Sequence, residues 1–472
     1  MQHSLLECTC LIVGGGIAGT SCLESLAFLS PKVKIIILTE SPLIKSVINV
    51  SQLTKTLHRF DIEEKQANSL ANEHIIVIQD CLVRIEHKTK QCFTSNGIVI
   101  NYEFLCLCSG ARPKLIEQSN KSPLVIGIRD TDTVFQFEKY LEKSKCLAIV
   151  GNGGIASDIV HEIKDVKVHW VIKDNYVSST FLDEGAAKFF QDSLFSDKNK
   201  SSVKYVIKRM RYTEDNQETN SQRGAALGPD WHRNFNLTGR FKNISSQTQI
   251  TLHKNCEVED IVENVNSEHP LTLKLSNNTK IECDLIISAT GVTPRIDYET
   301  DVPFKYGPDG GIFVDEFMQT SIPSIYAAGD VCYAGWNLAP NFFQMRLWTQ
   351  ARQMGSMAGK SISSKLNNEP VISDFCFELF GHITQLFGYQ VVLLGNYNGQ
   401  KLNNEYEIIL RVTPNKEFIK FVLKDGRLQG AMLIGETDLA ETCENLILNQ
   451  LDLSSYGTDI LDPNIDIEDY FD

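Results

Sequence analysis

Short runs of apolar residues alternate with glycine-rich or proline-containing turns along the first part of the chain. The run at Ile35–Leu38 is apolar at every position, as expected of a parallel strand that is covered on both faces. Residues 8–40 predict a strand, a glycine turn, a helix and a second strand, which begins an α/β domain. Further strands are predicted at Ile75–Ile78 and Phe104–Cys108.

A second unit of the same kind begins near residue 120. It contains predicted strands at Leu147–Val150 and Val168–Ile172, with a helix at Ile155–Ile163 between them and another at Glu184–Leu194. The stretch 196–249 is rich in Ser, Asn, Lys and Arg, and this composition predicts a partly disordered insertion into the second domain.

After the insertion we expect the chain to return to the first domain. Apolar strands are predicted at Asp284–Ala289 and Ser324–Ala328, followed by a helix at Phe342–Lys360. The predicted division is a first domain of 1–119 and 285–365, a second domain of 120–284, and a smaller α+β C-terminal domain of 366–472.

The C-terminal domain has strand-like runs at Gln390–Leu394 and Phe418–Leu423. Asp425 and Gly426 then form a strong signal for a two-residue hairpin turn. From Leu428 onward there is no Lys or Arg, while 11 residues are acidic. We expect an acidic tail at Asp459–Asp472, which serves either solubility or docking to a basic partner.

Two glycine runs follow predicted strands: Gly14-Gly15-Gly16-Ile17-Ala18-Gly19 and Gly151-Asn152-Gly153-Gly154-Ile155-Ala156. In each, the first glycine allows a tight turn and the second lets the backbone approach a pyrophosphate. The third position, Gly19 or Ala156, lets the helix pack close to its strand. The helix directs unpaired N–H groups at the phosphates. Two such runs predict that two dinucleotides are brought together, most commonly for hydride transfer.

The composition is that of a large globular protein, with 42% apolar and 22% charged residues in 472. The net charge of −14 (45 basic minus 59 acidic residues) argues against broad binding to nucleic acid or anionic membranes. No apolar run is long enough for a transmembrane helix, and the N-terminus has no signal-peptide pattern. We therefore expect a cytoplasmic and nuclear protein; the basic cluster Lys208–Arg211 is either a weak nuclear signal or, as we favour, a solvated loop.

The chain has 13 cysteines, an odd number, which without a secretion signal predicts reduced thiols. The pairs Cys8/Cys10 and Cys106/Cys108 each place two thiols on one face of a strand. We interpret them as small core residues rather than a redox pair. Neither pair has the nearby His or second cysteine pair typical of zinc, so no metal site is predicted.

Five motifs in order resemble the two-dinucleotide flavoprotein reductases, the pyridine nucleotide-disulfide oxidoreductases. They are the two glycine runs, the glycine turns ahead of proline at Ser109–Pro113 and Ala289–Pro294, and the segment Tyr326–Asp330. The resemblance covers residues 8 to about 360. It implies an α/β fold with two Rossmann-like domains, in which an FAD domain is interrupted by an inserted NAD(P)H domain, and it implies FAD and NADH or NADPH as cofactors.

The resemblance places the first glycine run at the FAD pyrophosphate. Glu40 is the candidate for the adenosine ribose, or Thr39 if the acidic position of the family falls one residue earlier. Asp330, after Gly329, resembles the aspartate that accepts a hydrogen bond from a ribityl hydroxyl. The next helix would direct its positive end at the flavin ring. The expected cofactor contacts are Gly14, Gly16, Ile17, Ala18, Gly19, Thr39, Glu40, Lys45, Ser109, Gly110, Gly151, Gly153, Ala156, Lys173, Gly291, Gly329, Asp330 and Trp348; the alternative for Trp348 is a buried aromatic residue.

The second glycine run is expected to hold NADH or NADPH. Lys173 and Asp174 end the next strand, where a base tolerates a 2′-phosphate and an acid favours a free hydroxyl, so the sequence does not decide. Asp158 stands where related reductases have a Glu near the nicotinamide, and Lys45 lies in the segment that runs under the flavin in relatives. We predict Lys45 and Asp158 as the catalytic pair across the two domains; the alternative for Lys45 is a solvated loop residue.

One feature departs from the resemblance. Disulfide reductases of this family have a Cys-X4-Cys pair soon after the second strand, but Ser41–Gln52 contains no cysteine. Because a thiolate is the electron relay in those enzymes, electrons here are expected to leave the flavin directly, to oxygen, a quinone-like acceptor or another protein. His382 is the nearest candidate for a proton donor, and we interpret it as a packing or interface residue.

The leading hypothesis is therefore an FAD-dependent NAD(P)H oxidoreductase with a non-disulfide acceptor. The resemblance implies a part in the oxidative-stress response and an association with the tRNA ligase complex, which such a protein would protect from oxidation. A second hypothesis is a redox-controlled binding protein whose NADH-reduced state engages a protein partner with little turnover. A third is a dinucleotide-binding fold without activity. Monomer and homodimer both stay open.

Overall fold

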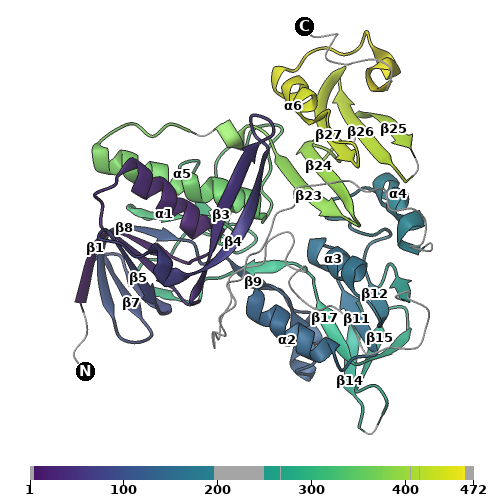
Figure 1. Ribbon diagram of the computed structural model, residues 1–472, viewed down its shortest axis with the longest axis horizontal. Coiled ribbons are helices and arrows are strands. Elements are labelled where there is room, and N and C mark those ends of the chain that lie inside the picture. The colour runs from purple at the N-terminus through teal and green to yellow at the C-terminus, as the bar shows by residue number, and fades with distance from the viewer. Residues whose placement is uncertain are drawn as a thin grey trace.

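The computed structural model describes residues 5–195, 249–265, 267–373, 375–403, 405–413 and 415–462. They form three domains: in Figure 1 the first lies at the left, the second at the lower right and the C-terminal domain at the upper right. Nearly all of the predicted insertion, and the tail beyond Asp462, lie outside the described residues. Within the described ranges, no helix is long and apolar enough to cross a membrane.

The first domain is built on an eight-stranded sheet with a parallel centre. Its strands, in spatial order, are β19 (Glu299–Thr300), β6 (Leu82–Glu86), β7 (Gln91–Thr94), β8 (Val99–Leu107), β1 (Leu5–Val13), β2 (Ile35–Thr39) and β5 (Ile75–Gln79), with β21 (Ile325–Ala327) also paired to β8. β1 lies between β2 and β8, and all three run in parallel. The carboxyl ends of β1 and β2 therefore meet at one edge, where ligands bind in such sheets.

Two helices, α1 (Ile17–Leu29) and α5 (Trp348–Asn367), pack closely against each other over this sheet (Figure 1). A glycine makes the contact possible, because a Cβ on Gly355 would lie 2.2 Å from the carbonyl oxygen of Ala18. Since α1 starts at the first glycine run, this packing also fixes where α5 begins relative to that run.

The helix predicted at Phe342–Lys360 is displaced toward the C-terminus, to Trp348–Asn367. The backbone N–H of Met345 donates to the side-chain oxygen of Gln350 at 2.9 Å, which holds the preceding segment outside the helix. The helix ends where Asn368 takes a left-handed conformation with φ of +56°.

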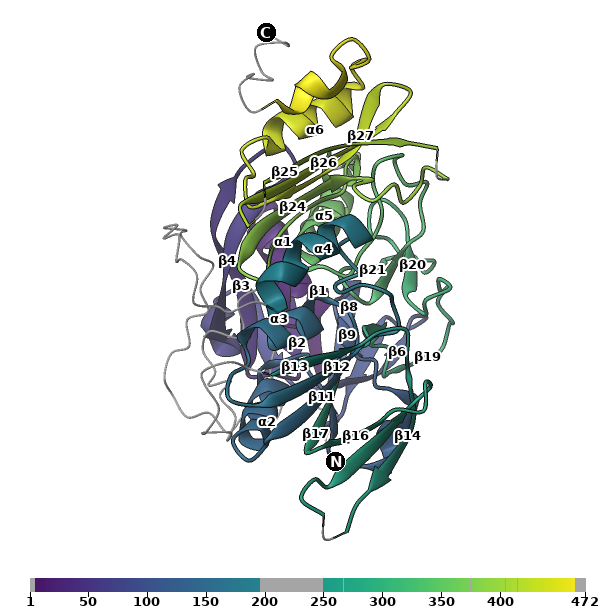
Figure 2. The same ribbon diagram turned by 90° about the vertical axis from the view of Figure 1, so that its right-hand side faces the viewer.

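The second domain has a five-stranded parallel sheet with helices on its faces (Figure 2). The strands, in spatial order, are β10 (Val125–Gly127), β17 (Leu285–Ser288), β11 (Cys146–Val150), β12 (Lys167–Val171) and β13 (Ile250–His253); the helices are α2 (Thr131–Leu141), α3 (Gly154–Glu162) and α4 (Glu184–Phe195). A small antiparallel sheet of β14 (Val258–Glu263), β15 (Leu271–Leu275) and β16 (Lys280–Cys283) is attached to it.

The boundary between these domains differs from the prediction. β17, assigned from the sequence to the first domain, pairs in parallel with β10 and β11 of the second. An apolar run of this kind predicts a buried parallel strand but does not indicate which sheet it joins. The chain returns to the first domain only at β18 (Val292–Pro294), which pairs with β9 (Ala111–Pro113). A second short ladder there joins β20 (Ile312–Val314) to β22 (Cys332–Ala334).

A long antiparallel hairpin follows β2, and we did not predict it. Its strands are β3 (Leu43–Gln52) and β4 (His58–Gln66). The signal available in the sequence was the alternation of apolar Phe60 and Ile62 with polar Arg59, Asp61 and Glu63. In Figure 1 the hairpin extends from the first domain to the C-terminal domain, so one element contacts both.

The C-terminal domain is a five-stranded antiparallel sheet covered by a helix. In spatial order its strands are β23 (Gly381–Leu386), β24 (Tyr389–Gly395), β27 (Arg427–Ile434), β26 (Glu417–Lys424) and β25 (Glu407–Thr413), and the helix is α6 (Ala440–Asn449). The hairpin turn predicted at Asp425 and Gly426 is confirmed, since φ is +51° and +69° at these residues.

The beginning of the predicted acidic tail is corrected. Residues Gly457–Leu461 form a short 3₁₀-helix, and Ile460 and Leu461 are buried against the core of the C-terminal domain. The composition after Leu428 is acidic, but these two apolar side chains belong to the folded domain.

Candidate active site

Two cavities adjoin the two glycine runs. The smaller, about 460 Å³, lies at the carboxyl ends of β1 and β2. The larger, about 1080 Å³, lies between the second, first and C-terminal domains. Both are of the size that ligand pockets have. Pro113 and Arg129 line both, so the two cavities adjoin each other.

The first glycine run has the backbone that a dinucleotide cradle needs. Gly14 has a φ of +117°, and a Cβ there would lie 2.2 Å from the carbonyl oxygen of Cys108. Gly19 packs directly against Gly14, because a Cβ added at Gly19 would lie 1.9 Å from the Gly14 carbonyl oxygen. Gly16 lines the smaller cavity and has open space where its Cβ would stand, and no side chain caps the helix that it begins. The residues present therefore fit a pyrophosphate at this helix end.

Thr39 and Glu40 both line the smaller cavity, as do Ser109 and Gly110. β2 ends at Thr39, so Glu40 is the first residue after the strand. Its carboxylate accepts two hydrogen bonds from Nη2 of Arg295, at 2.6 and 2.7 Å. Sequence reasoning missed Arg295, because no local pattern brings a residue so distant in the chain to this position.

Asp330 is 9% exposed and is not among the residues that line either cavity, but it pairs with Arg129, which lines both. Nη2 of Arg129 donates to its carboxylate at 2.5 Å, and Nε of Arg129 donates to the Ala111 carbonyl at 3.2 Å. Gly329 has a φ of +80°, and a Cβ there would lie 2.8 Å from the Cβ of Ala18. The constraint at Gly329 is thus contact with α1, where Ala18 is itself buried beside buried Ile17. Arg129 was also missed from the sequence.

The second glycine run repeats this geometry in the larger cavity. Gly151 has a φ of +131°, and its Cβ would lie 2.1 Å from the Ala289 oxygen. Gly153 begins α3 without a side-chain cap and lines the cavity, while Ala156 is fully buried and packs the helix. Gly291 also lines this cavity and has a φ of +100°.

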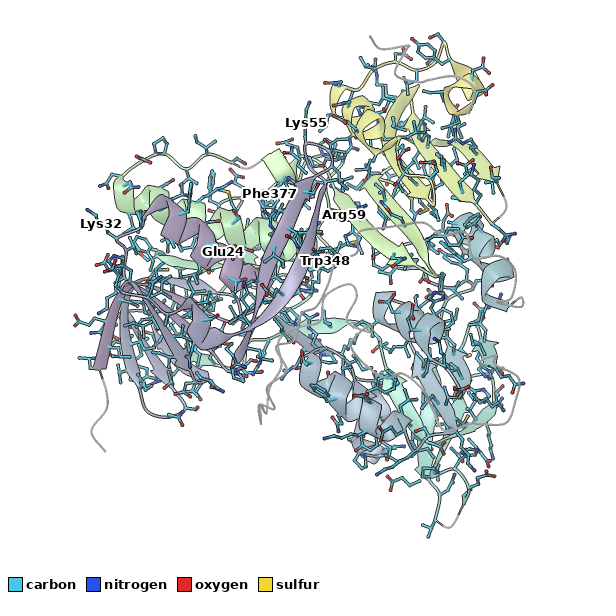
Figure 3. The ribbon with its side chains drawn as sticks, viewed as in Figure 1. Glu24, Lys32, Lys55, Arg59, Trp348 and Phe377 are labelled. Carbon is cyan, nitrogen blue, oxygen red and sulfur yellow. The ribbon has the colours of Figure 1, made fainter. Side chains whose placement is uncertain are left out.

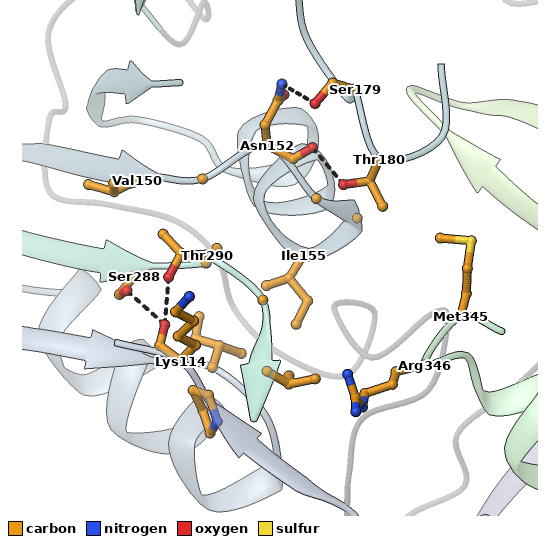
Figure 4. A pocket seen from close by; sticks show the side chains of 18 of the residues that line it. Lys114, Val150, Asn152, Ile155, Ser179, Thr180, Ser288, Thr290, Met345 and Arg346 are labelled. Atoms are coloured by element: carbon orange, nitrogen blue, oxygen red, sulfur yellow. Dashed lines mark hydrogen bonds between the residues drawn. The ribbon is translucent and has the colours of Figure 1, made fainter. Parts of the chain in front are cut away.

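Polar side chains are fixed around this second run (Figure 4). Nδ2 of Asn152 donates to the Asp174 carboxylate at 2.8 Å and to the Ser179 hydroxyl at 2.9 Å. The Ser179 hydroxyl donates to the same Asp174 oxygen at 2.7 Å. Lys173 and Asp174 both line the cavity. The orientation of the Asp174 carboxylate is therefore set before any ligand binds.

Aromatic residues form the wall of the larger cavity where α5 begins. Trp348 is the first residue of α5 and packs edge-to-face on Phe60, with ring centroids 4.6 Å apart. Figure 3 shows it beside β4, below Arg59. His382 is 1% exposed, lies 6.0 Å from the Trp348 ring and stacks on Phe181. Burial lowers the pKa of His382 to about 4, so this imidazole is neutral near pH 7.

Lys45 is not a solvated loop residue. It lies in β3 and is 1% exposed. Its Nζ donates to Oε1 of Glu64 at 2.7 Å, and the Thr131 hydroxyl donates to the same oxygen at 2.6 Å. Asp158 lines the larger cavity. The pairing of Lys45 with Asp158 stays a prediction, and Glu64 is a partner that sequence reasoning missed.

The cysteines behave as core residues, as the sequence suggested for the two close pairs. All 13 are free thiols, and Cys81 and Cys376 alone are not fully buried. The sulfurs of Cys106 and Cys108 lie 3.6 Å apart. Hydrogen bonding to the Cys108 and Cys22 sulfurs, together with burial, raises the pKa of Cys106 well above its usual value, so it is a neutral thiol.

Comparison with known proteins agrees with this geometry. The chain matches the family described as "Pyridine nucleotide-disulphide oxidoreductase" over residues 9–227 and 236–355. It is 50% identical to the Drosophila melanogaster protein named pyridine nucleotide-disulfide oxidoreductase domain-containing protein 1, over 99% of each chain.

Two solved structures share the fold. One is the putidaredoxin reductase–putidaredoxin complex (TM-score 0.68, 14% identity, 98% of each chain). The other is the water-forming NADH oxidase of Lactobacillus brevis bound to NADH (TM-score 0.67, 16% identity, 97% of this chain and 95% of that one). The predicted α/β architecture is confirmed, as are FAD and NAD(P)H as the cofactors of this protein type. The chain belongs to the pyridine nucleotide-disulphide oxidoreductase family.

Proposed function

We propose that this protein is an FAD-dependent oxidoreductase that takes a hydride from a nicotinamide dinucleotide and passes the electrons to an acceptor other than a disulfide. The observation that supports this most directly is that two separately cradled cavities adjoin each other at Arg129. The two dinucleotides, when bound, would supply the hydride donor and its acceptor, and the protein's part is to hold and orient both.

Different residues of the two cavities would bind the two dinucleotides. The uncapped N–H groups after Gly16 and after Gly153 would each hold a pyrophosphate. Asp330 would accept a hydroxyl hydrogen of the ribityl chain, and its ion pair with Arg129 keeps its carboxylate in place. The start of α5 at Trp348, also without a side-chain cap, would stabilise negative charge that develops on the reduced flavin.

We propose an electron acceptor other than a disulfide because the hairpin has no cysteine where disulfide reductases of this family carry a cysteine pair. The hairpin β3–β4 occupies the chain after β2 and its first strand contains no cysteine. The thiols of Cys106 and Cys10 are buried and protonated, because their pKa values are raised well above the usual value. Those two thiols are neutral and no cysteine stands in the strand after β2, so we propose that a small oxidant such as oxygen or a quinone, or a redox protein, would take the electrons directly.

The second candidate is a redox-controlled binding protein. The hairpin favours it, since one element carries buried Lys45 at one end and contacts Glu444 of the C-terminal domain at the other. A change at the flavin would then reach a surface that a partner recognises. For the oxidoreductase, the leading candidate, we also propose a part in the oxidative-stress response and protection of a tRNA ligase complex from oxidation. We propose that the protein is present in cytoplasm and nucleus, as a monomer or a homodimer.

Turnover separates the two candidates. The FAD-loaded protein is mixed with excess NADH and with oxygen or a soluble quinone, and NADH consumption is followed. Many turnovers per flavin support the enzyme. A single reduction with a long-lived reduced state, together with retention of the tRNA ligase complex on the immobilised protein only when NADH is present, supports the binding protein and excludes rapid catalysis.

A further inference from the structure

A buried ion pair lies in the hairpin next to the cavities. Lys45 and Glu64 stand directly opposite each other in the β3–β4 register, and their side chains are 1% and 4% exposed. Removing both charges from water costs several kcal/mol per ion, which the attraction between them only partly offsets. Stability alone is therefore a weak reason for this pair.

The carboxylate of Glu64 has a second partner, and it comes from another domain. The Thr131 hydroxyl donates to the same Oε1 at 2.6 Å. Thr131 is the first residue of α2, and the two residues before it, Arg129 and Asp130, line the smaller cavity. One oxygen atom of Glu64 thus joins the hairpin to the start of the second domain where the two cavities adjoin.

Lys45 is also tied to the first glycine run through its backbone. Its N–H donates to the Gly15 carbonyl at 3.0 Å, and its carbonyl accepts the Thr20 hydroxyl at 2.6 Å. The position of the Lys45 ammonium is consequently fixed from both sides, by the glycine run at its backbone and by Glu64 at its tip.

We propose that Glu64 is a positioning residue of the hydride-transfer site. It holds the ammonium of Lys45, whose backbone contacts the first glycine run, and through Thr131 it sets where the second domain begins relative to that charge. The inference rests on the proposed function and on the predicted role of Lys45 as a catalytic residue. A carboxylate is needed for this, since an amide carries no charge for the lysine and a shorter side chain reaches two donors less well.

The variants Glu64→Gln, Glu64→Asp and Thr131→Val test the proposal. The matched control is Glu63→Gln, because Glu63 is the neighbouring acid on β4, is partly exposed and pairs with Lys65 at the surface. FAD content and apoprotein unfolding are measured first. The limiting rate of anaerobic flavin reduction and the NADH concentration at half that rate follow, together with the reduction potential of the bound FAD measured without NADH.

We expect Glu64→Gln to lower the limiting rate roughly tenfold or more, with little change in the half-saturating NADH concentration. The reduction potential of FAD should rise, because a negative charge is lost near it. Glu64→Asp should recover part of both effects, and Thr131→Val should lower the rate without moving the potential. Glu63→Gln should match the wild type.

Unchanged rate and potential in Glu64→Gln, relative to Glu63→Gln, would overturn the proposal. If Glu64→Gln does not fold, the test uses Thr131→Val. A wild-type limiting rate of flavin reduction in Thr131→Val would contradict the link between the domains. If NADH fails to reduce even the wild-type flavin, the proposed function is wrong. The reduction potential of the bound FAD, compared between Glu64→Gln and the wild type, then tests the role of Glu64 without NADH.

Discussion

The side-chain amide of Asn152 donates a hydrogen bond of 2.8 Å to the carboxylate of Asp174 at the rim of the larger cavity. With a second hydrogen bond from Ser179, the carboxylate is fixed but keeps lone pairs for a ribose hydroxyl. A 2′-phosphate would meet this negative charge. We therefore predict that kcat/KM is higher for NADH than for NADPH, although Lys173 stands beside Asp174.

The substitution Asp174→Asn should reduce the NADH-to-NADPH ratio of kcat/KM by about tenfold or more, since an interaction of 1–3 kcal/mol is lost or reversed. Asp165→Asn is the control, because Asp165 is an exposed acid on the turn between α3 and β12. A wild-type protein that uses both nucleotides equally would contradict the assignment of Asp174.

The two glycines of the first run should respond differently to alanine. Gly14→Ala places a Cβ against the Cys108 carbonyl at a φ of +117°, so it should lower the free energy of unfolding of the apoprotein by about 2 kcal/mol or more. The Cβ that Gly16→Ala adds has no atom within 4 Å, so this variant should leave the apoprotein stable while weakening FAD binding. Urea unfolding and FAD titration check both. Normal FAD affinity in Gly16→Ala would remove this glycine from the cofactor site.

Glu444 should be a main attachment of the hairpin to the C-terminal domain. It is 1% exposed, and its carboxylate accepts hydrogen bonds from the Thr54 hydroxyl, from the Lys55 N–H at 2.7 Å, and from the hydroxyl and N–H of Thr56. Glu444→Gln should lower the free energy of unfolding by about 2–3 kcal/mol, because hydrogen bonds to a charged group are lost. The exposed Glu441 of the same helix gives the control, Glu441→Gln. Equal midpoints for the two variants would show that the attachment lies elsewhere.

His382 should make the protein sensitive to acid. Its pKa is lowered from 6.5 to about 4 in the folded state, so between these values the unfolded chain binds more protons and stability falls as the pH falls. The loss from this group should reach roughly 2 kcal/mol at about pH 5. His382→Asn does not titrate and should lose less stability between about pH 7.5 and about pH 5. His169 has a similarly lowered pKa, so the dependence should shrink rather than vanish. An undiminished pH dependence in His382→Asn would count against this account.

The sequence predicted the features that depend on local backbone chemistry. Gly14 and Gly151 need a positive φ and a close approach to another strand, and both requirements are visible as glycine after an apolar run. The same holds for the turn at Asp425 and Gly426. These parts of the site and fold could therefore be placed without coordinates.

The features that the sequence did not predict depend on contacts between distant segments. Glu64 and Arg129 are charged residues of a kind that usually faces solvent, and nothing local indicates that one is buried beside Lys45 and the other beside Asp330. The strand β17 shows the same limit, since its apolar residues fit either sheet. Burial of charge is decided by the partner, and the partner comes from elsewhere in the chain.

The proposed function requires that a nicotinamide deliver its hydride to a flavin where the two cavities adjoin. The most direct test is the visible flavin spectrum of the FAD-loaded protein, recorded without oxygen before and after one equivalent of NADH is added. We predict that the oxidised flavin bands disappear in the wild type and persist in Gly153→Ala, whose FAD cradle is intact. Oxidised flavin that persists in the wild type, although both dinucleotides are shown to bind, would contradict the account.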